Sequence, residues 1–410
     1  MPCLGMKAFI GRWWPRLPAL WLAGALAAWL GTNQFVLFFA MALAAVWLIG
    51  LLLGAGPCVR TPADWPMAII ALWLPVNYWA SADKGLSIQA AANLLVGMAL
   101  CYLVVAVGQV GRRPLWPMYL FLLVGAGLLL AVALVPGGLR GRLTLPGPLL
   151  ALAQRIPETV NANVLAGALL PSALLASSLA LAPGRPLIRV ASICLFAASA
   201  GVMVLGASRG ALLGLAVGVL ALLAVLSRWH RLGAVVLAAG GGVVIWRVGL
   251  ANLLELLGKG GATGSMAGRV EVWSRALYAL QDFAFTGIGI GTFERVIPIL
   301  YPYFLIGPDS SVPHAHNLFL QVGVDLGLPG LIAYATIVVL SLWMALATSQ
   351  KAAGWRRYAA AGVWAGLIGV LAHGLVDAVL WGTKPAAVLW WLLALAATFY
   401  SSEELSNGTS

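Results

Sequence analysis

Long apolar runs, repeated along the chain, constrain its fold more than any other feature. An α-helix rises about 1.5 Å per residue, so about 20 apolar residues cross the hydrocarbon core of a bilayer. Strands of a membrane barrel alternate in polarity and are only about 10 residues long, so runs of this kind favour helices. Twelve such runs lie at about 17–31, 34–54, 66–80, 86–108, 115–136, 160–182, 187–207, 210–227, 232–249, 316–346, 357–380 and 385–400.

The composition excludes a water-soluble protein of this size. Hydrophobic residues make up 62% of the 410 residues, charged residues make up only 9%, and the mean hydropathy is +0.97. Soluble domains carry about a quarter charged residues. We therefore expect an all-α fold, a polytopic membrane helix bundle of about 12 transmembrane helices.

The distribution of lysine and arginine predicts the orientation of these helices. Cytoplasmic loops of membrane proteins carry an excess of both residues. With the N-terminus in the cytoplasm, the short outer connections hold only Lys84, Arg209 and Lys384, and both termini are cytoplasmic. The cytoplasmic segments then hold Lys7, Arg12, Arg16, Arg60, Arg112, Arg113, Arg185, Arg189, Arg228, Arg231, Lys351, Arg356 and Arg357.

We expect no nucleic-acid partner, no cofactor and no metal. The net charge of +12 follows from topology, because most basic residues lie in short gaps between apolar runs. No DxD motif, HExxH motif or serine nucleophile elbow is present. The four cysteines lie far apart without a CxxC pair, which argues against a zinc site or a disulfide framework. They are Cys3, Cys58, Cys101 and Cys194.

The apolar runs divide the chain into four parts. Residues 1–249 hold the first nine spans and a smaller outer loop at about 137–159, and residues 250–315 form one large outer loop. The last three spans occupy 316–400, and a short polar tail, 401–410, ends in the cytoplasm. Apolar residues at three- and four-residue spacing predict an amphipathic helix in the large loop, from Arg269 to Phe283. Its apolar face is Val270, Trp273, Leu277 and Leu280.

Two arginines on the outer side are candidates for binding an anion. Arg209 lies between two apolar spans, where an arginine is costly unless it is paired or reaches water. Arg269 begins the loop helix, and a helix start beside an arginine suits a phosphate or pyrophosphate. The alternatives are snorkelling to the interface for Arg209 and plain solvation for Arg269. Arg142 and Arg140 stand in the smaller outer loop.

Two histidines stand where the large loop becomes a membrane helix. His314 and His316 belong to the segment Pro313–Gly330, and a histidine there can accept a proton near neutral pH. Either one alone is more often a structural hydrogen-bonding group. Asp325 lies nine residues after His316 and about half a turn off its face, so we expect its carboxylate to bond a neighbouring helix instead.

His373 and Asp377 lie four residues apart in the eleventh span and share a helical face. With the predicted topology, Asp377 lies toward the outer end, where it could support the site near His316. The alternative is a hydrogen bond between helices that holds the bundle together.

These residues together resemble the O-antigen ligases and their relatives. In that family a His is followed by Asn, Ser or Gln, then nine residues, Gly, two residues and Gly, and His316, Asn317, Gly327 and Gly330 fit every position. Arg209 at a span start, and Arg269 followed by Trp273 and the glycines of 287–291, are similar to the family's two arginine regions. The family often has a glutamate where this chain has Asp325.

The resemblance implies a C-type membrane glycosyltransferase whose large loop and active site face the periplasm, in the inner membrane of a bacterium. The donor would be O-antigen on undecaprenyl pyrophosphate, and the acceptor a sugar hydroxyl of lipid A–core. The transfer would be inverting and independent of metal and nucleotide. His316 would act as general base, and Arg209 and Arg269 would hold the pyrophosphate. His314, Asn317, Asp325, Asp377 and Arg142 are candidates for supporting roles.

Three other functions stay open. An O-antigen polymerase would use the same donor twice, and a protein O-oligosaccharyltransferase would modify a secreted protein. The non-enzyme alternative is a polysaccharide transporter or flippase, but no repeated half and no paired broken helices are evident.

Overall fold

A computed structural model describes the positions of most of the chain. It covers residues 59–109, 115–134, 162–206, 208–249, 266–307, 310–378 and 380–407, with a few single positions near the N-terminus. Within these residues there are twelve helices and no strand, so the predicted all-helical fold is confirmed. They are α4 (Asp64–Ala80), α5 (Lys84–Gln109), α6 (Leu115–Leu134), α8 (Ala162–Ala180), α9 (Pro186–Leu205), α10 (Arg209–Leu226), α11 (Arg228–Val248), α13 (Met266–Asp282), α14 (Phe293–Leu300), α15 (Leu318–Lys351), α16 (Gly354–Gly374) and α17 (Ala386–Asn407).

The helices coincide with the predicted apolar runs. Ten of the twelve runs correspond to helices, and the first two runs lie almost entirely outside the described residues. Five helices are long and apolar enough to cross a membrane, namely α5, α9, α10, α11 and α15, and shorter apolar stretches lie in α6, α8 and α17. The chain is therefore a membrane protein with several spanning helices, and the count of twelve spans stays a prediction.

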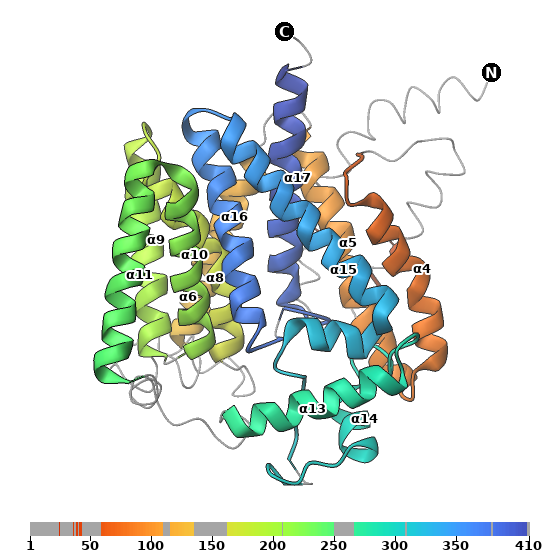
Figure 1. The fold of residues 1–410 in the computed structure, drawn as a ribbon. Coiled ribbons are helices and arrows are strands. Elements are labelled where there is room, and N and C mark those ends of the chain that lie inside the picture. Colours follow the sequence, from red (N-terminus) through yellow and green to blue (C-terminus); the bar gives the residue numbers. More distant parts are fainter. Residues whose placement is uncertain are drawn as a thin grey trace, which may run out of the picture.

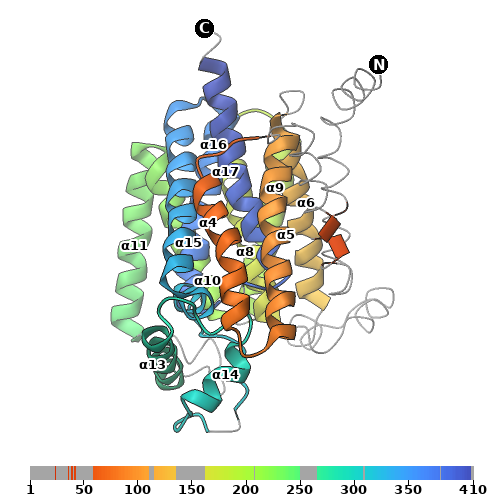
Figure 2. The same cartoon turned by 90° about the vertical axis from the view of Figure 1, so that its right-hand side faces the viewer.

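Long helices run side by side in one bundle, and α13 lies across one of its ends (Figures 1 and 2). In the centre, α16 packs against α8, α10, α15 and α17. Small residues permit close approach, because a Cβ on Gly214 of α10 would lie 2.6 Å from the carbonyl oxygen of Gly369 in α16. At the rim, α11 buries only Ala234. Its many exposed apolar side chains suit contact with lipid.

The two ends of the bundle differ in charge and in content. The α13 end holds the starts of α5, α10, α15 and α17, and the C-terminus lies at the opposite end (Figure 1). The opposite end carries the basic residues that flank α9, α11, α15 and α16, namely Arg185, Arg228, Lys351, Arg356 and Arg357. The lysines and arginines of the short loops therefore gather at one end, as the topology prediction requires. Which side of the membrane that end faces stays a prediction.

The helix α11 runs unbroken through the triplet Gly240–Gly242, with open space around each glycine. Two details of the predicted helices were wrong. The span 316–346 is two helical pieces, because Gly327 breaks α15 with φ 71° and ψ −177°. A Cβ on Gly327 would lie 2.3 Å from the carbonyl oxygen of Phe285, so this position requires glycine. The span 357–380 is too long, since α16 ends at Gly374.

The loop helix exists, but only half of its predicted apolar face turns inward, since Leu280 packs against a buried cluster and Trp273 contacts the His316 carbonyl. Val270 and Leu277 of α13 are 54% and 46% exposed. The buried face consists of the small residues Gly268, Val272, Ala276 and Ala279, which let α13 lie close to α15 and to the cluster around Phe293 and Tyr303. Small side chains on α13 therefore make the contact with α15 that larger side chains were expected to make.

Candidate active site

The predicted histidines and Asp377 meet at the α13 end of the bundle. Nε2 of His314 lies 3.5 Å from Oδ1 of Asp377, and Nδ1 of His316 lies 4.0 Å from the same oxygen. The two imidazole rings pack edge to face with their centroids 4.5 Å apart. His314 and His316 come from the segment before α15, and Asp377 comes from the turn after α16. Because α16 ends three residues earlier, Asp377 lies in a turn rather than on the helical face predicted for it.

The backbone at His316 is held in an unusual conformation. Its φ is 48°, in the left-handed region, where residues other than glycine are uncommon and where functional sites store strain. The His316 amide donates to Nδ1 of His314 at 3.2 Å, and the indole of Trp273 in α13 donates to the His316 carbonyl at 3.4 Å. The loop helix thus fixes the histidine segment from outside the bundle.

Asn317 fixes the same segment from the other side. Its side-chain oxygen accepts from the amides of Phe319 and Leu320 at 3.0 Å each, which makes it the N-cap of α15. Its side-chain nitrogen donates to the carbonyl of Leu375 at 3.2 Å. Asn317 therefore joins the start of α15 to the turn that carries Asp377.

Arg209 and Arg269 come from two different helices and are close enough for their charges to interact. Arg209 is the first residue of α10, and a Cβ on the next residue, Gly210, would lie 3.1 Å from the His373 ring. Arg269 lies in the first turn of α13, half-buried. Burial lowers the pKa of Arg269, the charge of Asp377 opposes that shift, and the charge of Arg209 adds to it. Two positive charges in one half-buried place favour an anionic ligand between them.

Burial keeps both histidines neutral at neutral pH. It lowers the pKa of His314 from its ordinary value, and Asp377 opposes the shift. The pKa of His316 falls to about 4, first because the ring is buried and then because His314 is beside it. A neutral imidazole has one ring nitrogen free to accept a proton. The cluster can therefore take a proton from a bound hydroxyl group.

Residues 194–335 match the family model described as O-antigen ligase, and no curated protein matches the chain. The chain therefore contains a stretch that is similar to the O-antigen ligases. The matched stretch extends from the middle of α9 to the middle of α15 and includes Arg209, Arg269, His314, His316, Asn317 and Asp325. Asp377 lies beyond the matched stretch, and the fold brings it to the same site.

Two polar atoms in the candidate site are buried without a hydrogen-bond partner. In the part of the chain that the structure describes, they are Nε of Arg269 and Nδ1 of His316. Buried polar groups are nearly always paired, and an unpaired one needs an explanation. A bound substrate with oxygen atoms at this place would supply the missing partners.

The ligand atoms of His314, His316 and Asp377 all lie within 4.8 Å of one another, a spacing that could hold a metal ion. The neighbouring charge of Arg269 opposes a cation there, because it acts electrostatically on both histidines. We therefore assign the cluster to proton transfer beside an anionic group. The expectation of a metal-independent reaction stays a prediction.

Two other predicted residues do not join the cluster. Asp325 is fully buried below the histidine segment, and its carboxylate accepts from Gln321 on its own helix and from Trp381 in the connection before α17. A bond to a neighbouring helix was expected, and the partner instead lies in a loop. Arg142 lies outside the described residues, as does Arg140. No local pattern pointed to Gln321 or Trp381, because both are identified only by their contacts with Asp325.

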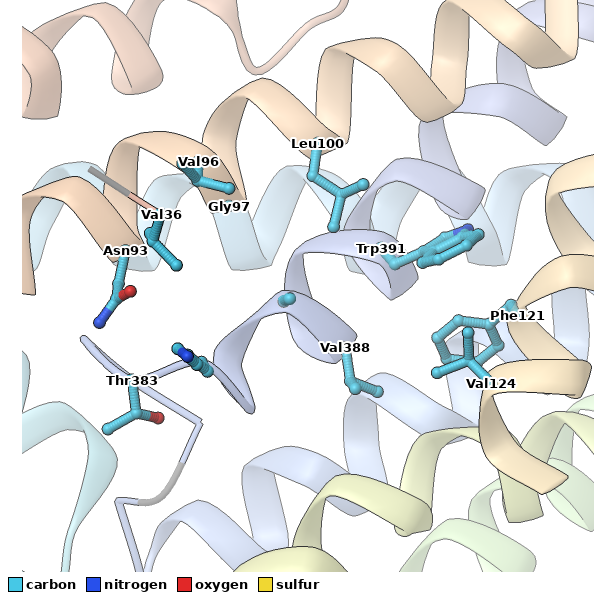
Figure 3. Close-up of a pocket in the computed structure, with 12 residues that line it drawn as sticks. Val36, Asn93, Val96, Gly97, Leu100, Phe121, Val124, Thr383, Val388 and Trp391 are labelled. Atoms are coloured by element: carbon cyan, nitrogen blue, oxygen red, sulfur yellow. The ribbon is translucent and has the colours of Figure 1, made fainter. Parts of the chain in front are cut away.

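The hollow between α5, α6 and α17 is a different feature from the candidate site. Asn93 and Thr383 stand at one end of it, with Phe121 and Trp391 toward the other, and Lys384 also lines it (Figure 3). It contains none of the predicted site residues. Its mostly hydrocarbon walls suit an acyl or isoprenoid chain and offer little to a sugar or a phosphate.

Proposed function

We propose that this protein is an O-antigen ligase. It transfers O-antigen polysaccharide from undecaprenyl pyrophosphate to a sugar hydroxyl of lipid A–core in lipopolysaccharide biosynthesis. The observation that carries the proposal is the meeting of a neutral histidine pair, one carboxylate and two arginines at one end of a membrane bundle, within a domain that matches this family.

The proposed reaction inverts the configuration at the anomeric carbon. As the acceptor oxygen forms its bond to that carbon, the bond from carbon to the pyrophosphate oxygen breaks. Negative charge then grows on the leaving pyrophosphate, where Arg209 and Arg269 stabilise it. His316 takes the proton of the acceptor hydroxyl, and the Asp377 carboxylate, 4.0 Å from its ring, stabilises the imidazolium that forms.

The pyrophosphate is a good leaving group without further activation, so the proposed reaction uses no nucleotide, cofactor or metal. We place the site at the periplasmic face of the bacterial inner membrane, with both termini in the cytoplasm. The basic residues at the end opposite α13 support this orientation. The α13 end then faces the compartment where lipid-linked O-antigen and lipid A–core meet.

An O-antigen polymerase is the second candidate, because the same arginines and histidines would serve a lipid-linked chain as acceptor. The domain match covers residues 194–335 and does not reach the segments before Cys194, where a different acceptor could be recognised. A protein O-oligosaccharyltransferase would need a polypeptide acceptor instead. The acceptor therefore separates the three functions.

The test is transfer with purified components. Protein in nanodiscs would be mixed with undecaprenyl-pyrophosphate O-antigen and lipid A–core, with chelator and without nucleotide, and the products separated on a gel. A ladder on the core that is lost in His316→Ala and kept in His230→Ala supports the ligase. His230 is a matched control because it lies in the first turn of α11, at the opposite end of the bundle. Growth of the lipid-linked chain alone would indicate a polymerase, and no new glycosidic bond would overturn the proposal.

A further inference from the structure

A chain of buried hydrogen bonds runs beneath the candidate site. The amide of Ala315, between the two histidines, donates to Oε1 of Gln321 at 2.7 Å. Nε2 of Gln321 donates to Oδ1 of Asp325 at 2.9 Å, and the indole of Trp381 donates to Oδ2 of the same carboxylate at 2.9 Å. Gln321, Asp325 and Trp381 are 4%, 1% and 3% exposed. We call these three side chains the carboxylate hub.

The hub connects the two segments that carry the site. One arm ends at Ala315, next to His316, and the other ends at Trp381, four residues after Asp377. Both arms converge on one carboxylate whose two oxygens each accept one bond. Any movement of one segment relative to the other would break a bond in this chain. The hub therefore fixes the distance between His316 and Asp377.

The hub is itself anchored to the rest of the bundle. The side-chain nitrogen of Asn77, at the end of α4, donates to the Asp325 carbonyl and to the Thr286 carbonyl. The Asn77 oxygen accepts from the amide of Ile290 at 2.9 Å. Next to the hub, the helix breaks at Gly327, and the turn after α13 packs into the break. Asp325 is thus held on its backbone as well as on its side chain.

Stability alone does not explain a carboxylate at this place. Burying a carboxylate is costly, and well-packed apolar side chains of similar volume often stabilise a fold as well or better. What a carboxylate adds is two directed acceptors at a fixed separation. Here both acceptors serve segments that carry reacting groups. This is the arrangement expected of a group that positions a site.

We propose that Asp325, through Gln321 and Trp381, is a positioning residue that holds His316 and Asp377 in register for proton transfer. The proposal rests on the proposed function for the reaction that it supports. Asp325 touches no substrate, so it acts only through the two segments. A displacement of about 1 Å at a reacting group costs about a hundredfold in rate, which is enough for the hub to control turnover.

The test exchanges the carboxylate of Asp325 and the amide of Gln321, singly and together. In Asp325→Asn, the new amide nitrogen faces the donor of Gln321 or of Trp381. In Gln321→Glu, two carboxylates face each other. In the double variant, Glu at 321 accepts from Ala315 and from the new Asn at 325, whose oxygen accepts from Trp381. Every bond of the hub is then restored, with the same total charge.

We expect each single variant to lower kcat about 10- to 100-fold with the donor KM nearly unchanged, because the arginines still bind the pyrophosphate. The double variant should recover to within about threefold of the wild type. Wild-type kcat in Asp325→Asn, or a folded double variant no better than the single variants, would overturn the proposal. Melting in detergent identifies variants that merely fail to fold.

A second readout does not depend on the reaction. Nitrogen-15 shifts of labelled His316, followed against pH, report the surroundings of its ring. The titration midpoint should move in both single variants and return in the double variant. If the wild type transfers nothing to any acceptor but this pattern holds, the proposed function fails and the positioning role of the hub stands. A midpoint that is the same in all four proteins overturns the role of the hub.

Discussion

The carboxylate hub and the candidate site lie next to each other, and they treat buried polar groups in opposite ways. In the hub and its anchor Asn77, each side-chain nitrogen and oxygen of Asn77, Gln321 and Asp325 has a partner. In the site, Nε of Arg269 and Nδ1 of His316 are buried without one. Burying polar atoms costs free energy in both regions. Only in the hub do hydrogen bonds within the protein offset that cost.

The pairing of buried polar atoms therefore distinguishes these two neighbouring regions. Paired polar atoms hold a backbone in place, whereas unpaired ones gain a hydrogen bond, and with it free energy, when a ligand binds. Substitutions in the hub should therefore lower stability as well as transfer, and substitutions in the site should lower transfer at almost constant stability. This contrast can be tested residue by residue.

The largest effect is expected at His316. His316→Ala removes the proposed general base, and a general base contributes about 10²- to 10⁴-fold to a rate. Transfer should fall by at least about a hundredfold in a single-turnover assay. The melting temperature should change little, because Nδ1 of His316 has no hydrogen-bond partner to lose. A large loss of stability together with the loss of transfer would contradict the contrast.

The opposite result is expected at Asn77, which is fully buried. Asn77→Ala leaves the Ile290 amide and the carbonyls of Asp325 and Thr286 without their partner. We expect a loss of about 3 kcal/mol in the free energy of unfolding, because each buried unpaired group costs about 1–3 kcal/mol. Thermal melting in nanodiscs measures it, with Thr336→Ala as control, since Thr336 is exposed on α15 and bonds only to its own helix. Equal melting temperatures would show that the anchor of the hub adds no stability.

A smaller effect is expected at Arg269. Arg269→Lys keeps the positive charge but removes the planar group that can bind two oxygens of a phosphate. We expect the donor KM to rise about tenfold, the worth of one charge-assisted hydrogen bond. Arg295→Lys is the matched control, because Arg295 lies in the same loop and is paired with Asp83 at an exposed place. An unchanged KM in Arg269→Lys would remove Arg269 from the pyrophosphate site.

Much of the fold and part of the site could be predicted from the sequence, for different physical reasons. A membrane span is encoded locally, so the run predicted at 86–108 matches α5 at Lys84–Gln109. The histidines and arginines were found because charged and ionisable residues are rare among apolar runs. The role of Asn317 as a helix cap was missed, although an asparagine directly before an apolar helix is its usual signal.

The remaining features depend on contacts that no local pattern encodes. Gln321 and Trp381 are 60 residues apart and meet only because Asp325 lies between them. Asp377 was placed on a helix that ends before it, and the turn is what points it at the histidines. The inner face of α13 was partly wrong because alanines can make a contact that periodicity assigns to larger side chains. Tertiary packing decides each of these.

The smallest effect is expected from pH. Burial and His314 lower the pKa of His316 to about 4, well below the 6.5 of an ordinary histidine. Because the base works in its neutral form, protonation at low pH removes activity, and a lowered pKa moves that loss to lower pH. Between pH 8 and pH 6, kcat/KM, which reports the free enzyme, should change less than about twofold. An ordinary histidine would lose about three quarters of its neutral form by pH 6. A fall in kcat/KM centred near pH 6.5 would mean that the His316 ring is open to water in the free enzyme. The candidate site would then not differ in burial from a solvated loop.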